Sequence, residues 1–266
     1  MRKIPVLAAF THAVKSTWHN LPFAFHISWP WLLLLIPVSI WGETEKPTID
    51  VVAATPVQQA EMNAFLLKTY VSGFVSMIIY ASIAISWHLY ILKDEVPQGL
   101  SRLRFDRMVW RYFGNSILVV LFATLALFPL VLALVGFGTA AGLSPQGIVN
   151  CVVIAAVLIA LPVTYRLSVK LPAIALGRRD FTFGDAWNAT RGNSIQLIRL
   201  GVMAVIVAVI TGVTLGLLQD TIGKIAGDVL KWPFVLIRQL AGWVLAVFAI
   251  TMLTSLYGFF VEKRDF

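Results

Sequence analysis

Two stretches of the sequence, Trp110-Arg-Tyr-Phe-Gly-Asn-Ser-Ile117 and Trp187-Asn-Ala-Thr-Arg-Gly-Asn-Ser-Ile195, share a tryptophan and the tetrapeptide Gly-Asn-Ser-Ile. Aligning Gly114 with Gly192 gives an offset of 78 residues. Each stretch is basic and leads into a long apolar run. A looser third copy begins at Lys15-Ser-Thr-Trp18. The pattern predicts three copies of one unit, each a helix on the membrane surface followed by two membrane-crossing helices.

The composition is that of an integral membrane protein. Of 266 residues, 59% are apolar and only 13% are charged, whereas soluble domains carry about 25% charged residues. Several apolar runs are long enough to cross a bilayer as helices. The single cysteine, Cys151, excludes an intrachain disulfide. The net charge of +8 does not indicate nucleic acid, because the basic residues gather in one set of loops.

We therefore expect an all-α polytopic transmembrane bundle that forms a single domain over 1–266, with repeats at about 1–92, 93–171 and 172–266. The six predicted spans are about 23–41, 64–92, 113–136, 148–171, 195–218 and 237–260. Amphipathic surface helices are expected at about 4–20, 93–112 and 172–193, with Asp180 or Thr182 as a cap in the last. Between spans we expect an outer loop over 42–63 and a short amphipathic outer segment over 219–236.

The distribution of positive charge predicts the orientation, since cytoplasmic loops are enriched in lysine and arginine. One side of the predicted bundle holds five basic residues: Lys46, Lys68, Lys224, Lys231 and Arg238. The other side holds sixteen: Arg2, Lys3, Lys15, Lys93, Arg102, Arg104, Arg107, Arg111, Arg166, Lys170, Arg178, Arg179, Arg191, Arg199, Lys263 and Arg264. Both termini are therefore expected in the cytoplasm.

The cytoplasmic arginines and tryptophans form the candidate binding surface. Arginine recognises phosphate groups, and anionic lipid headgroups supply them at this depth. The candidate lipid or phosphate ligands are Arg102, Arg104, Arg107, Arg178, Arg179 and Arg191. The candidate interfacial anchors are Trp18, Trp110 and Trp187. A partner membrane protein, or a second copy of the chain, is the alternative to lipid.

Two further patterns have competing interpretations. A ladder of small residues in the fifth span, Ala204, Ala208, Gly212 and Gly216, allows close helix packing, either within the chain or between copies. His26 and His88 lie at similar predicted depths and are weak candidates for haem ligands. Interfacial hydrogen bonding is the simpler interpretation of both histidines, so we expect neither a metal nor a cofactor.

The sequence carries no recognisable catalytic signature: it has no nucleophile elbow, phosphate-binding loop or zinc-protease motif. No carboxylate lies in the middle of a predicted span, which counts against ion-coupled transport. We expect a non-enzymatic scaffold, assembly or accessory protein. A transporter or lipid translocator, with a path opened at Pro129 and Pro162, is the alternative, and a haem protein is the third hypothesis.

Three segments carry a family resemblance: Trp87-His-Leu-Tyr-Ile-Leu-Lys-Asp-Glu95, Arg166-Leu-Ser-Val-Lys-Leu-Pro-Ala-Ile-Ala-Leu-Gly177 and Asp185-Ala-Trp-Asn-Ala-Thr-Arg-Gly-Asn193. Together they resemble a family of uncharacterised proteobacterial inner-membrane proteins, similar to the membrane domain attached to some glycerophosphodiester phosphodiesterases. The resemblance covers nearly the whole chain and implies a location in the bacterial inner membrane. No phosphodiesterase catalytic domain is present, so it implies no such activity.

Overall fold

The computed structural model describes residues 2–42, 55–226 and 230–266, and this part of the chain is all-α. Six helices are long and apolar enough to cross a membrane. They are α2 (Leu21–Gly42), α3 (Pro56–Lys93), α4 (Arg107–Ala140), a fourth, composite span over Pro145–Ala175, α9 (Ser194–Ala226) and α10 (Lys231–Phe260). The composite span joins α5 (Pro145–Ala155), a π-helical turn (Ala156–Ala160), α6 (Leu161–Ser168) and α7 (Lys170–Ala175). The predicted fold class, with six candidate spans, is confirmed.

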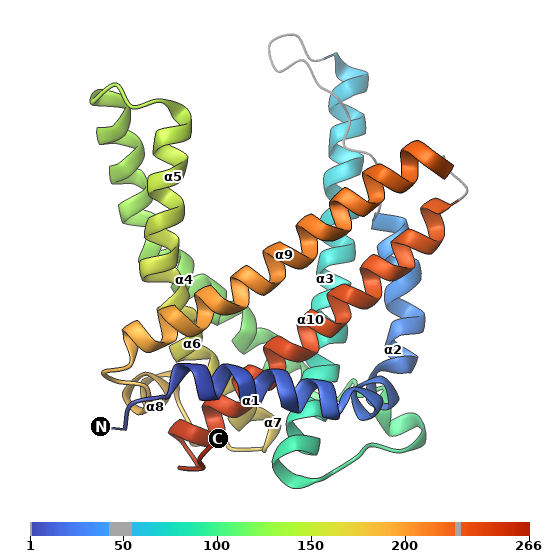
Figure 1. The fold of residues 1–266 in the computed structure, drawn as a ribbon, viewed down its shortest axis with the longest axis vertical. Helices are drawn as coiled ribbons and strands as arrows, with labels where there is room; N and C mark the ends of the chain where they lie inside the picture. Colours follow the sequence, from blue (N-terminus) through green and yellow to red (C-terminus); the bar gives the residue numbers. More distant parts are fainter. Residues whose placement is uncertain (1, 43–54, 227–229) are drawn as a thin grey trace.

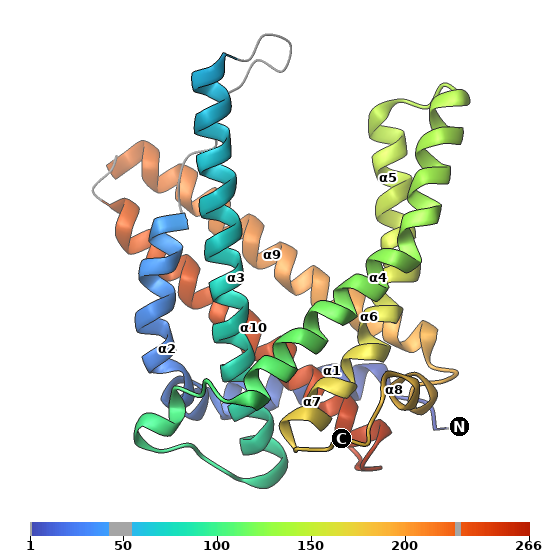
Figure 2. The same cartoon turned by 180° about the vertical axis from the view of Figure 1, so that it is seen from behind.

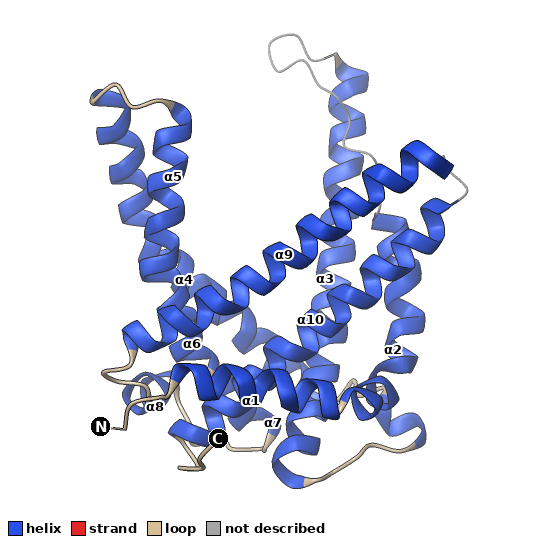
Figure 3. Cartoon of the chain, viewed as in Figure 1, coloured by secondary structure: helices blue, strands red, loops and turns tan. Residues whose placement is uncertain are grey.

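Both termini lie at one end of the molecule, beside α1 (Val6–His19), α7, α8 (Phe183–Ala189) and the 94–106 loop (Figures 1 and 2). We call this end the base. From the base, α2 and α3 rise together while the α4–α5 hairpin diverges from them (Figures 1 and 2). Colouring by secondary structure shows how little loop connects the described helices (Figure 3). Two termini at one end are what an even number of crossings requires.

The third helix is the centre of the bundle. In its most apolar window 61% of the residues are buried, against 11% in the corresponding windows of α4, of the composite span and of α9. The main apolar cluster joins α3 to α2, α4, α7 and α10, and a second cluster joins α1, α9 and α10 near the base. The outer halves of α4, α5 and α9 therefore present apolar side chains outward, as helices in lipid do.

The helices extend beyond several predicted limits. A capping box between Thr55 and Gln58 begins α3 at Pro56, so residues 56–63 are helical instead of part of the predicted outer loop. Residues 43–54 of that loop lie outside the described residues. Similarly, α9 continues to Ala226 and α10 starts at Lys231, so no separate helix forms in the described parts of 219–236; residues 227–229 are not described.

The prediction of a surface helix over 93–112 is wrong. After Lys93 the chain turns through Asp94, whose φ of 56° is left-handed, and it contains Pro97 and a left-handed Gly99 (φ 53°). Only Gly99–Arg102 forms a short 3₁₀ turn. Asp106 then caps α4 by accepting from the backbone amides of Met108 and Val109, so the last residues of the predicted surface helix start a span.

The first predicted surface helix, α1, is present and has three faces. Small residues (Ala9, Ala13 and Thr17) are buried against the bundle. Leu7, Val14 and Trp18 are exposed on a second, apolar face, and Lys15, His12 and His19 lie on the third. A helix that contacts protein, lipid and water at once suits the boundary between headgroups and acyl chains.

The third predicted surface helix is shorter than expected. The residue that caps α8 is Thr182, which forms a capping box with Asp185. Hydrogen bonds from the Thr182 hydroxyl and amide hold the pKa of the Asp185 carboxyl below its usual value. Helices α1 and α8 thus each precede a pair of spans, whereas the middle pair follows a loop, and the threefold repeat stays a prediction.

Among the described glycines, Gly201 is the one at which an added Cβ would lie closest to atoms of another span. A Cβ at Gly201 of α9 would collide with Leu161 and would lie 2.7 Å from Cε2 of Tyr165, both on α6. A Cβ at Gly212 of the same helix would meet no atom within 4 Å. Helices α6 and α9 therefore pack closely at Gly201, where the Leu161 and Tyr165 side chains of α6 occupy the space that a side chain on α9 would fill.

We expect Gly201→Ala to lower the thermal unfolding temperature in detergent, because overpacking costs about 1–3 kcal/mol. Gly212→Ala is the matched control on the same helix, and it should leave that temperature unchanged or raise it slightly. Equal unfolding temperatures for the two variants would contradict the α6–α9 packing.

Candidate functional site: an arginine pocket at the base

A cavity of about 240 Å³ opens at the base between the start of α4 and the turn that follows α7. Three of its six lining residues are arginines: Arg107 and Arg111 on α4, and Arg179 on the turn. The others are Asp106, Met108 and Gly177. Two segments about 70 residues apart in the sequence thus supply one cluster of positive charge.

Two local features bring these arginines together. Capping by Asp106 starts α4 directly before Arg107, and Arg111 follows one helical turn later on the same face. On the other side, Gly177 adopts a left-handed φ of 77° at the end of α7. Its amide donates to the Ile174 carbonyl and the next amide donates to the Ala173 carbonyl, a pattern that ends a helix and reverses the chain.

The pocket has an excess of unneutralised positive charge. Among the described residues, Arg107, Arg111 and Arg179 form no hydrogen bond or ion pair. The one acid in the lining, Asp106, pairs instead with Arg104, whose Nε and Nη2 lie 3.2 and 2.9 Å from Asp106 Oδ2. Burial alone would raise the pKa of the Asp106 carboxyl, but the hydrogen bonds from Arg104 and the Val109 and Met108 amides hold it below its usual value.

The other predicted arginine ligands lie apart from this pocket. The guanidinium of Arg102 contacts Nε2 of His26 at 2.7 Å, and its carbonyl accepts from the indole of Trp31. Arg178 donates to the Tyr257 hydroxyl at 3.1 Å and to Asp180. Of the six arginines singled out in the sequence, the structure therefore brings only Arg107 and Arg179 into one pocket.

Arg191 is exposed, and its neighbours hold the N-terminal segment. The Asn193 side chain accepts from the Ile4 amide at 3.0 Å and donates to the Arg2 carbonyl at 3.1 Å. The Lys3 ammonium donates to the Gly192 carbonyl. The shared Gly-Asn-Ser motif of this copy therefore binds the protein's own chain, and no cavity that Arg191 lines is among those described here.

Sequence reasoning counted Arg111 for orientation but missed it as a site residue. Its signal was the four-residue spacing from Arg107, which places both side chains on one face of a helix. The signal was obscured because that segment was assigned to a surface helix, whereas it starts a span.

The three predicted tryptophan anchors are all partly exposed at the base, Trp18 most and Trp187 least. Trp187 also packs under the guanidinium of Arg166, whose Cζ lies 4.4 Å from the ring centroid. Trp110 makes edge contacts with Phe105 and Phe113. Amphipathic rings at this level are suited to the headgroup region.

The two histidines singled out as haem candidates have different surroundings. His88 is fully buried, with Nδ1 2.8 Å from Thr254 Oγ1 and Nε2 3.1 Å from the Tyr112 hydroxyl. Because the Thr254 hydroxyl already donates to the Ile250 carbonyl, Nδ1 is the nitrogen that carries the proton and Nε2 accepts from Tyr112. Iron ligation by His88 would require one of these bonds to break, and His26 is engaged by Arg102.

The small-residue ladder on α9 is open. Ala208, Gly212 and Gly216 are exposed, and a Cβ at either glycine would meet nothing within 4 Å. Only Ala204 packs against the second apolar cluster. Close packing of α9 within the chain occurs at Gly201 instead, and association of two copies through the ladder stays a prediction.

We expect Tyr112→Phe to destabilise the protein, because it leaves His88 Nε2 buried without its hydrogen-bond donor, at a cost of about 1–3 kcal/mol. Thermal unfolding in detergent measures this effect. Tyr70→Phe deletes the same hydroxyl from an exposed position on α3 and serves as the control. A Tyr112→Phe variant that unfolds at the control's temperature would contradict the hydrogen-bond assignment.

The Asp106 carboxylate gives a pH-dependent stability. Its folded pKa lies below the ordinary value of 3.8, so its contribution is complete above that pH and is lost as pH falls through the folded pKa. Asp106→Asn keeps a helix-capping side chain but removes the charge. We expect the variant to unfold at lower temperature than the wild type near neutral pH, and the difference to disappear in acid below 3.8; a difference independent of pH would contradict the ion pair with Arg104.

Comparison of the chain with protein-family models, with curated proteins and with solved structures finds no match. The function must therefore be inferred from the geometry of the chain itself.

Proposed function

We propose that this protein is a non-enzymatic scaffold or accessory protein of the bacterial inner membrane that binds anionic lipid headgroups at its base. The observation that supports this most directly is the pocket of Arg107, Arg111 and Arg179, three guanidinium groups without a protein partner among the described residues. Planar guanidinium groups donate two parallel hydrogen bonds to a phosphate, which makes arginine the best-suited side chain for such headgroups.

The surroundings of the pocket favour lipid over a soluble phosphate. The surface helix α1 exposes Leu7, Val14 and Trp18, and Trp110 on α4 is exposed one turn from Arg107. These side chains belong at the level of the headgroups. A phosphate bound by the three arginines would therefore lie where lipid phosphates already lie.

The orientation we propose puts the base in the cytoplasm. Sixteen of the 21 lysines and arginines belong to the segments predicted on this side, and anionic lipids of the cytoplasmic leaflet attract such clusters by about 1 kcal/mol per basic residue. Anionic lipid held by the pocket would also offer a charged rim to a partner membrane protein, which is how an accessory role would operate.

The proposal predicts loss of anionic lipid when the three arginines are neutralised together as Arg107→Gln, Arg111→Gln and Arg179→Gln. Protein reconstituted in nanodiscs that contain phosphatidylglycerol and phosphatidylcholine is released into the gas phase, and retained lipids are counted by native mass spectrometry. We expect retention of phosphatidylglycerol to fall at least about tenfold, because charge-assisted hydrogen bonds are lost, with little change for phosphatidylcholine.

Arg191→Gln is the control, since it also removes a basic side chain from the base but lies outside the pocket. If the control loses as much phosphatidylglycerol as the triple variant, binding is a general effect of charge and the pocket assignment is wrong. Unchanged retention in the triple variant would contradict the proposed function.

A lipid translocator is the second candidate, and one observation favours it. The fourth span contains the π-helical turn Ala156–Ala160, which ends two residues before Pro162, and π turns within helices are frequent at functional sites. Scrambling of a fluorescent phospholipid by the purified protein in vesicles would support this candidate. Absence of scrambling by protein that is correctly folded would exclude it.

A further inference from the structure

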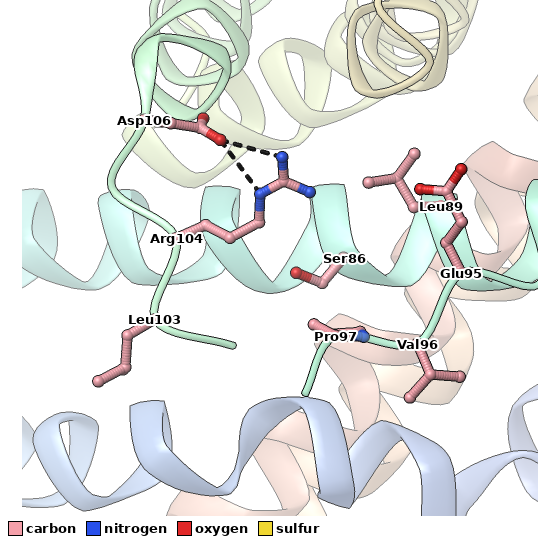
Figure 4. A pocket seen from close by; sticks show the side chains of 8 residues that line it. All are labelled: Ser86, Leu89, Glu95, Val96, Pro97, Leu103, Arg104 and Asp106. Atoms are coloured by element: carbon pink, nitrogen blue, oxygen red, sulfur yellow. Dashed lines mark hydrogen bonds and ion pairs between the residues drawn. The ribbon is translucent and has the colours of Figure 1, made fainter. Parts of the chain in front are cut away.

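A larger cavity, of about 620 Å³, lies beneath the 94–106 loop and against α3 (Figure 4). Its walls are apolar at Leu89, Val96, Pro97 and Leu103, and polar at Ser86, Glu95, Arg104 and Asp106. This volume is within the range of cavities that bind small ligands. The cavity shares only Asp106 with the arginine pocket, and the inference below does not rest on the function proposed for that pocket.

A buried hydroxyl without a partner marks the inner end of this cavity. Ser86 is only 1% exposed, and its Oγ forms no hydrogen bond. Figure 4 shows its side chain extending from α3 into the space between the two arms of the loop. A buried polar group normally has a partner. Thr17, Ser28 and Ser82 also have buried hydroxyls without one, but Ser86 is the one of the four that lines this cavity, where it offers a ligand a hydrogen-bonding group.

The guanidinium of Arg104 has one unused edge. Its Nε and Nη2 are both engaged by Asp106, and the third nitrogen carries no bond in Figure 4. The Asp106 carboxylate neutralises this arginine, so the pair adds a hydrogen-bond donor to the cavity without a net positive charge. This differs from the arginine pocket, where three cations face one acid.

At the outer end, Glu95 adds an acceptor for a cation. Its ion-pair partner is the Lys93 ammonium at 4.0 Å, which is beyond hydrogen-bond distance. The carboxylate oxygens therefore remain available to N–H groups of a ligand. With Arg104 and Asp106 paired, Glu95 leaves the lining with a net negative charge, which disfavours a purely anionic ligand.

The depth of these groups limits the shape of the ligand. Ser86 lies seven residues before the end of α3 at Lys93, which is about 10 Å at about 1.5 Å per residue. Arg104 lines the same cavity as Ser86 and Glu95. A ligand that reaches both Ser86 and Glu95 must therefore be elongated, with an ammonium at Glu95 and an apolar portion against the leucine wall of the cavity.

We propose that this cavity binds a phospholipid with a phosphoethanolamine headgroup. The primary ammonium donates to Glu95, the phosphate accepts from the free edge of Arg104, and a glycerol ester oxygen accepts from the Ser86 hydroxyl. The acyl chains lie against the apolar wall of the cavity at Leu89 and Leu103. A phosphocholine headgroup has no N–H for Glu95, so the site discriminates between two zwitterionic lipids of nearly the same size.

The test uses the full-length protein in nanodiscs that contain phosphatidylethanolamine, phosphatidylcholine and phosphatidylglycerol, with retained lipids counted by native mass spectrometry. The wild type should retain phosphatidylethanolamine over phosphatidylcholine by about tenfold, as expected for a charge-assisted hydrogen bond. Glu95→Gln should abolish that preference and leave retention of phosphatidylglycerol unchanged. Ser86→Ala should lower retention of phosphatidylethanolamine about fivefold, the effect of one neutral hydrogen bond.

Ser82→Ala is the matched control for Ser86→Ala. Ser82 lies one turn deeper on α3, is equally buried and also lacks a hydrogen-bond partner, but it does not line the cavity. Thermal unfolding of each variant establishes that it is folded, and Glu95, being exposed, can be changed without disturbing the core.

Three results would each overturn the proposal: no preference for phosphatidylethanolamine in the wild type, a preference that survives Glu95→Gln, or equal losses in Ser82→Ala and Ser86→Ala. Soluble glycerophosphoethanolamine, added as a competitor, distinguishes a site for a free headgroup from a site for an intact lipid. It should displace the bound lipid only weakly, because it lacks the acyl chains, and displacement at equal concentration would show that the ligand is not a lipid.

Discussion

Within a bilayer there is no water to hydrogen-bond a buried polar side chain, so a partner within the protein stabilises it. The dipeptide Trp87-His88, near the base end of α3, meets this constraint twice. The Trp87 indole donates to Thr251 at 2.9 Å, and His88 bonds Thr254 on the next turn of α10. Because Tyr112 of α4 completes the set, three spans are held at one level close to the base.

This arrangement explains why the bundle is tight near the base and open beyond it. Close to the base, α3 is surrounded by α2, α4, α7 and α10, and farther out the α4–α5 hairpin separates from the rest (Figures 1 and 2). The arginines at the base fall into two groups according to their contacts. Some, such as Arg102 and Arg178, are bound to the protein's own side chains, whereas those around the smaller cavity have no protein partner among the described residues.

The sequence allowed the class, the six spans and the first surface helix to be predicted, because apolar runs and helical periodicity are local properties. Thr182 could also be identified as one of two possible caps. The loop over 94–106 was not predictable in this way, because its basic and apolar residues recur at the spacing of an amphipathic helix. Pro97 and the left-handed Gly99 decide against that helix, and their effect depends on how α3 ends.

The candidate sites were predictable only in part. A run of arginines indicates a basic surface, but pairing within the fold determines which of them are free. Arg104 is paired with Asp106, whose carboxylate also caps α4, so this arginine is neutralised within the fold. The cavity that Ser86 lines could not be foreseen either. A serine in a span is usually read as a packing residue, and its missing partner is visible only once the neighbouring helices are in place.

The N-terminal segment is fastened by residues that are synthesised far later. Asn193 binds the backbone at Arg2 and Ile4, and Arg2 pairs with Asp265 next to the last residue of the chain. During biosynthesis, α1 emerges before α9 and α10 and can complete these contacts only after both of them have formed. Its amphipathic character suits it to a membrane surface until then, so α1 is locked in place only after helices that follow it by nearly 200 residues in the chain.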